Sequence, residues 1–278
     1  MITLAVLRTG KSTRAQISAV SVTEVTDAAG PFLANWRTLM EIHPGIHHFN
    51  TGPFNWYVLE EAGRLTVVDT GFPGHYAVFR EGLQTIGRSI HDVAAIVITH
   101  AHADHLGFAG RLRRETGVPV YIHEADRAAA SRVLQLPWFG LVTNVWRPFT
   151  ASVVAHAVAS GLFRMTSVPE TVGFRDGETL DVPGRLHVLH TPGHTPGEVV
   201  LYSPARGVLF SGDTLVTQNL LTGARGRPQV VARPLNADHQ QARRTLDRLR
   251  NLGRVTLLPG HGHPWTGSIA EAIAAARG

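Results

Sequence analysis

The chain has 278 residues, of which 44% are hydrophobic and 17% charged, and it contains no cysteine. This composition excludes a disordered chain, a disulfide framework and a thiolate metal site. The net charge of +5 comes almost entirely from arginines, which are scattered without a long basic run, so nucleic acid is not a favoured partner. No apolar run approaches the roughly 20 residues of a membrane-spanning helix, and residues 1–19 lack the apolar core of a signal peptide. We therefore expect a cytoplasmic protein that has no membrane partner.

The first readable elements are strands. Residues 1–45 have no clear role, whereas apolar runs at 46–49, 56–60 and 65–68 predict three strands joined by tight turns. The third run ends in Asp69, a carboxylate that is costly to bury without a partner. Two interpretations stay open for Asp69. It can support a metal-bound histidine through the outer ring nitrogen, or it can cap the turn at residues 71–74.

The densest motif follows the next strand. Residues 94–98 predict a buried strand, and the sequence THAHADHLG then occupies residues 99–107. His100 and His102 lie two positions apart and project to one side, which suits one metal ion. Asp104 and His105 fall at a helix start and point to a second position. A His-rich surface turn is the alternative, and this spacing directly after a buried strand makes it the less favoured one.

Residues 128–168 differ in character from the rest of the chain. They are rich in aromatic residues and only weakly periodic. We interpret them as a helical cap over an apolar substrate pocket, with Trp138, Phe139 and Trp146 as candidate substrate contacts. Additional core, or an interface between two copies of the chain in a homodimer, is the alternative.

Three later strand ends deliver the remaining candidate ligands. The strand at 185–189 leads into the loop HTPGHTPG, where His194 suits the first metal ion and His190 a supporting contact. The strand at 208–210 leads to Asp213, whose carboxylate is suited to bridge two ions, and the strand at 255–258 leads to His261, which completes the second. In the loop at 223–228, Arg225 and Arg227 can grip a substrate carboxylate or phosphate, unless this loop is simply solvated.

The series DTG, THAHADH, TPGHTPG, SGDT and PGHG, spread over residues 45–265, resembles the metallo-β-lactamase fold hydrolases. The resemblance implies an α/β fold, a four-layer αββα sandwich, in one domain over residues 1–278 with 128–168 as an insertion. It also implies that the metal ligands are His100, His102, Asp104, His105, His194, Asp213 and His261.

The resemblance further implies a reaction. Two divalent ions, zinc first and iron or manganese as alternatives, would share a hydroxide that attacks the carbonyl of a small-molecule ester, lactone or thioester. Asp104 and Asp213 are the candidate catalytic carboxylates. Asp213 resembles the glyoxalase II-like and lactonase-like branches, although Val216 stands where acyl-homoserine lactonases commonly carry tyrosine. A nucleic-acid phosphodiesterase and a mono-iron oxidoreductase similar to persulfide dioxygenases are the alternatives.

Overall fold

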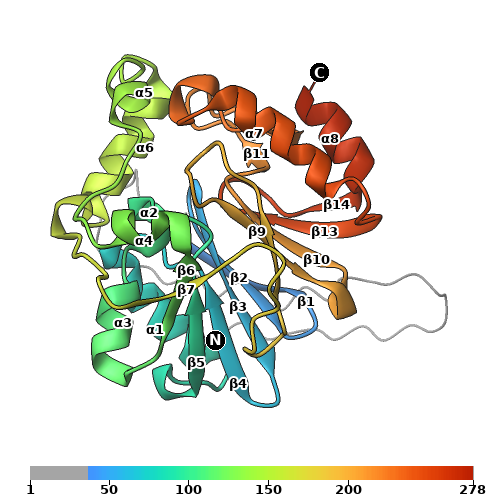
Figure 1. Ribbon diagram of the computed structural model, residues 1–278. Helices are drawn as coiled ribbons and strands as arrows, with labels where there is room; N and C mark the ends of the chain where they lie inside the picture. The colour runs from blue at the N-terminus through green and yellow to red at the C-terminus, as the bar shows by residue number, and fades with distance from the viewer. Residues whose placement is uncertain (1–36, 278) are drawn as a thin grey trace, which may run out of the picture.

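The computed structural model describes residues 37–277. Two mixed β-sheets pack face to face, and helices cover the outer face of each, so the expected αββα sandwich is confirmed (Figure 1). No helix among these residues is both long and apolar enough to cross a bilayer.

The first sheet has seven strands that lie side by side in sequence order. They are β1 (Arg37–His43), β2 (Ile46–Thr51), β3 (Phe54–Glu61), β4 (Arg64–Val68), β5 (Val93–Val97), β6 (Val120–His123) and β7 (Thr171–Phe174). Tight turns make β1 to β4 antiparallel, whereas β4 to β7 run parallel because helices cross over between them. The crossover helices include α1 (Tyr76–Thr85), α2 (Ala103–Leu106) and α3 (Ala109–Thr116).

The second sheet has five strands in the order β14-β13-β10-β9-β8. They are β8 (His187–His190), β9 (Val199–Ser203), β10 (Val208–Gly212), β13 (Arg254–Pro259) and β14 (Trp265–Ser268), with α7 (His239–Thr245) and α8 (Ile269–Arg277) outside them. A separate two-stranded sheet joins β11 (Val216–Gln218) to β12 (Arg225–Gln229).

Three apolar clusters hold these layers together. One packs the first sheet against α1 and α3, with Phe79 and Phe108 fully buried. The second lies between the sheets and includes Leu59 and Val199. The third packs the second sheet against α7 and α8, with Leu246 and Ile269 fully buried. Burial of apolar surface on both faces of each sheet explains why their central strands are continuous apolar runs.

The structure assigns elements to two segments whose structure the sequence left open. Residues 37–43, counted above in the stretch of unclear role, form β1 at the edge of the first sheet, while residues 1–36 lie outside the described part of the chain. The segment 128–168 carries α5 (Trp138–Val142) and α6 (Pro148–Ala159), followed by a short 3₁₀ helix, η4 (Leu162–Arg164). Helices α5 and α6 stand at one side of the two sheets, at the upper left of Figure 1.

A buried histidine of β2 predicts that the stability of the fold depends on pH. Burial lowers the pKa of His48 from 6.5 to about 4, although its hydrogen bond to Asn55 acts in the opposite direction. The unfolded chain therefore takes up this proton at a higher pH than the folded chain does. Stability should fall by about 3 kcal/mol between pH 6.5 and pH 4.

Urea denaturation of the protein and of His48→Gln at several pH values checks this dependence, with His91→Gln as the exposed control. In a plot of the free energy of unfolding against pH, His48→Gln should lose the part of the slope that His48 contributes, and His91→Gln should keep it. Equal slopes for His48→Gln and the unaltered protein would contradict the assignment.

Candidate metal centre

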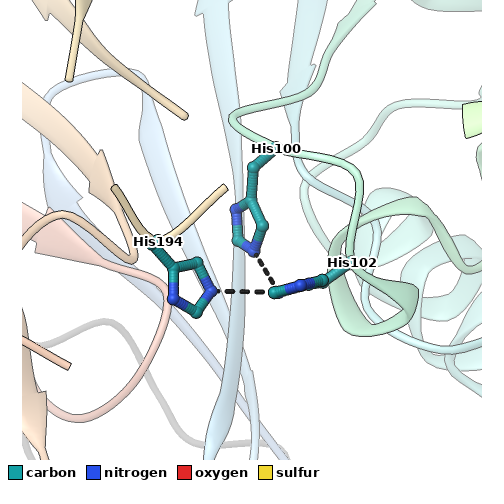
Figure 2. A group of neighbouring side chains, drawn as sticks. All are labelled: His100, His102 and His194. Atoms are coloured by element: carbon teal, nitrogen blue, oxygen red, sulfur yellow. Dashed lines mark hydrogen bonds between the residues drawn. The ribbon is translucent and has the colours of Figure 1, made fainter. Parts of the chain in front are cut away.

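Three histidines from two separated segments converge on one point. His100 follows β5, His102 precedes α2, and His194 lies in the loop between β8 and β9. The Nδ1 atom of His102 lies 3.1 Å from Nε2 of His100 and 2.9 Å from Nε2 of His194 (Figure 2). Nitrogen ligands around one tetrahedral zinc ion lie about 3.3 Å apart. The spacing of these nitrogens therefore suits three ligands of a single ion.

A second group lies beside the first. Asp104 Oδ2 is 3.6 Å from Nε2 of His105 and 3.5 Å from Nε2 of His261, and the three residues could hold one ion. Asp213 lies between the two groups, because its Oδ2 is 3.3 Å from Nε2 of His194 and 3.2 Å from Nε2 of His261. The structure thus brings together all seven residues that the sequence analysis selected, with Asp213 between the two groups.

The electrostatic environment of the two groups suits metal binding. Burial lowers the pKa of His194 to about 3 and that of His100 well below its ordinary value, so both rings are neutral, as ligands must be. Burial acts to raise the pKa of Asp213, but His261 and His194 hold it well below its usual range. Burial acts to lower the pKa of His105, but Asp69 and Asp104 raise it to about 10. These carboxylates therefore favour a positive charge at this position, which a metal ion would supply in place of the proton on His105.

Unsatisfied atoms provide an independent test of whether a metal fits. Nε2 of His105, Nε2 of His261 and Oδ1 of Asp213 are buried without a hydrogen-bond partner among the described residues. A buried polar atom without a partner costs about 1–3 kcal/mol. Divalent cations at this position would satisfy all three atoms, so the residues present fit a metal pair.

The outer nitrogens of two ligands are held in place. Nδ1 of His105 donates to Oδ2 of Asp69 over 2.8 Å, and the same carboxylate accepts hydrogen bonds from the backbone N–H and the hydroxyl of Thr99. Nδ1 of His261 donates to the carbonyl of Pro53 over 2.7 Å. Such contacts fix the tautomer and the direction of a ligating ring. Of the two interpretations left open for Asp69, the structure favours support of a ligand.

Two buried acids that the sequence analysis did not select also support the centre. Oε2 of Glu198 lies 3.1 Å from Nδ1 of His100, and its Oε1 accepts a hydrogen bond from the backbone N–H of Asp213. Burial, followed by repulsion from Asp213, raises the pKa of Glu198. An acidic residue directly before the apolar run of β9 was the available signal for Glu198.

Asp126 is the second of these acids, and it ties together the two loops that carry the first histidine group. Its carboxylate accepts hydrogen bonds from Ala101 N (2.9 Å), Thr195 Oγ1 (2.8 Å) and Gly197 N (2.7 Å). Ala101 lies between His100 and His102, and Thr195 follows His194. Asp126 is therefore a positioning residue for all three nitrogens.

Replacing Asp126 by asparagine should weaken metal binding by the first histidine group. The two carboxylate oxygens of Asp126 accept three hydrogen bonds, and the asparagine side chain would put an NH₂ group, itself a donor, against at least one of these donors. We expect roughly 10–100-fold weaker affinity for one of two metal equivalents, the range typical of supporting contacts. Competition with a chromogenic chelator measures this, and the exposed Asp181→Asn is the control. Unchanged affinity for both equivalents would contradict the positioning role.

Three further residues that the sequence analysis selected lie outside the two groups of candidate ligands. The ring of His190 stacks on His123 with centroids 4.0 Å apart, and its Nε2 bonds the carbonyl of Pro196, so its contacts support the loop and not a candidate ligand. Arg225 lies on strand β12, exposed, with its guanidinium 3.3 Å from His263, and Arg227 is exposed on the same strand.

An apolar cavity of about 150 Å³ opens onto the cluster. Its floor includes His102, Asp104, His194, Asp213 and His261, and half of its lining residues come from segment 128–168. Trp138, a candidate substrate contact, lines the cavity. Phe139 and Trp146 are not among its lining residues and are 80% and 72% exposed, because they point away from it.

An αββα sandwich whose strand ends gather histidines and carboxylates at one edge defines a class of metal-dependent hydrolases. Comparison with known proteins supports this classification. The probable metallo-hydrolase YflN of Bacillus subtilis (strain 168) is 28% identical over 245 residues, which are 82% of this chain and 87% of that protein. The chain belongs to the metallo-beta-lactamase superfamily, whose family model matches residues 50–261.

Solved structures show the same relationship. The metallo-beta-lactamase family protein TTHA1429 from Thermus thermophilus matches with a TM-score of 0.60 and 26% identity, over 84% of this chain and 79% of that chain. The protein TTHA1623, solved in a di-iron-bound form, matches with a TM-score of 0.50 and 28% identity, over 77% of this chain and 89% of that chain. The expected fold, the hydrolase class and a divalent-metal requirement are therefore established at the level of the superfamily.

Proposed function

We propose that the protein is a dinuclear metal-dependent hydrolase of esters, lactones or thioesters that carry an apolar group. One observation carries this proposal: the seven candidate ligands cluster together, and five of them form the floor of a cavity whose walls are otherwise apolar. An apolar cavity of this size holds a molecule such as benzene, so it suits a small acyl or aryl group beside the reacting carbonyl.

Each group of residues has a distinct task. His100, His102 and His194 would hold one ion, Asp104, His105 and His261 the other, and Asp213 both. When bound, two divalent ions supply an activated water and polarise the attacked oxygen. Asp104 lines the cavity and can accept the proton released on attack. The apolar walls orient the acyl group and keep other water away from the reacting centre.

The nature of the metal follows from the donor set. Imidazole and carboxylate ligands without thiolates suit zinc, and they also suit iron or manganese. Zinc is our first assignment, and the di-iron form of TTHA1623 supports a pair of ions in this fold.

Metal analysis followed by a substrate panel tests the proposal. The protein, loaded with zinc, iron or manganese, is assayed on aryl esters, lactones, thioesters, a β-lactam and a phosphodiester. We expect the fastest turnover on a carboxylic ester, lactone or thioester, with loss of activity on chelation. Preference for the phosphodiester, or oxygen consumption with a persulfide and one iron per chain, would overturn it in favour of the corresponding alternative.

A further inference from the structure

The exposed apolar side chains of this protein are concentrated in one segment. Of the ten large hydrophobic side chains that the described residues expose, eight lie within 128–168. Five of them form a patch on and directly after α5, which we call the apolar rim: Trp138, Phe139, Val142, Val145 and Trp146. Exposed apolar patches of this kind mark sites of association with a protein or a membrane.

The charged residues of segment 128–168 have a single sign. Segment 128–168 contains three arginines (Arg132, Arg147 and Arg164) and no aspartate or glutamate. The guanidinium of Arg147 lies over the ring of Trp146, 4.7 Å from its centroid. Arg233 is exposed on the 3₁₀ helix η6 (Arg233–Leu235), which packs against Gly140 of α5. Exposed tryptophan and phenylalanine flanked by arginine are typical of helices that lie in the interface of an anionic bilayer.

The apolar rim is continuous with the cavity above the metal centre. Trp138, Val142 and Val145 line that cavity and are also 45%, 63% and 45% exposed. These three residues therefore form part of its mouth. The apolar rim therefore joins the outer surface to the cavity, and an acyl chain that leaves an apolar surface could follow it toward the metal centre.

Contrary to the expectation from the sequence of no membrane partner, we propose that the apolar rim docks on an anionic lipid surface and admits substrates with a membrane-partitioned acyl chain. A second copy of the chain is the less suitable occupant, since two such faces would bring arginines of both copies together while segment 128–168 supplies no acidic partner. The docking proposal depends only on the exposed residues of the apolar rim, whereas the proposed substrate class rests on the proposed function.

Sedimentation with vesicles tests the docking. Phosphatidylcholine vesicles with and without phosphatidylglycerol are mixed with the protein, with Phe139→Ser/Trp146→Ser, and with Arg132→Glu/Arg147→Glu. The matched controls are Met40→Ser/Val172→Ser, which removes exposed apolar groups outside the segment, and Arg254→Glu, on β13. Circular dichroism and melting temperature show that each variant folds.

We expect binding to the anionic vesicles that weakens with salt, and roughly tenfold or greater loss of binding in both test variants but in neither control. No binding to anionic vesicles, or a concentration-dependent dimer that Phe139→Ser/Trp146→Ser disrupts, would overturn docking on lipid. Because binding is also measured after chelation of metal, its failure is distinct from failure of the hydrolase assignment. Faster turnover of long-chain than short-chain esters only when vesicles are present would support the substrate class, and no chain-length dependence would contradict it.

Discussion

Replacing Asp213 by alanine should abolish hydrolysis while leaving the fold intact. Oδ2 of Asp213 is the oxygen that lies within 3.3 Å of a candidate ligand nitrogen in each group, so its loss would remove a ligand from each of the two proposed ions. We expect turnover to fall roughly 10³-fold or more, because a metal pair that no longer shares a bridge loses its activated water. Affinity for both metal equivalents should fall together.

Steady-state assays and metal titration measure these effects, with circular dichroism to confirm folding. Asp181→Ala, at an exposed carboxylate that lies 3.9 Å from Arg185, is the matched control and should behave as the unaltered protein. Near-normal turnover in Asp213→Ala would show that the assigned bridge is not part of the reaction.

Replacing His102 by alanine should reduce turnover as strongly, but by removing a ligand of one proposed ion and not of both. His102 contributes the central nitrogen of the first group and makes no close contact with the second. We therefore expect binding to fall from two metal equivalents to one, with turnover reduced roughly 10³-fold or more. The exposed His91→Ala is the control. Loss of both equivalents, or retention of both, would contradict the division into two groups.

The fold and the candidate ligands could be predicted because both depend on local signals. His194, Asp213 and His261 each follow a short apolar strand in a turn that contains glycine or proline, and the other four ligands follow the apolar strand at 94–98. Strand ends of a sandwich meet at one edge, so residues with this pattern converge even when they are far apart in the chain.

The supporting acids could not be predicted in the same way. Glu198 and Asp126 act through contacts with segments distant in sequence, such as that between Asp126 and Gly197, 71 positions apart. An acid beside an apolar run has no local feature that names its partner. For the same reason, the aromatic composition around α5 did not show which side of this short helix faces the cavity, and Phe139 lies on the exposed side.

The stoichiometric titration of metal-free protein with zinc, monitored by hydrolysis of an aryl ester, tests the central claim most directly. If seven nitrogen and oxygen donors hold a pair of ions that activates water, activity should require the second equivalent, reach a plateau at two per chain, and disappear on chelation. Full activity at one equivalent, or activity that persists after complete chelation, would contradict it.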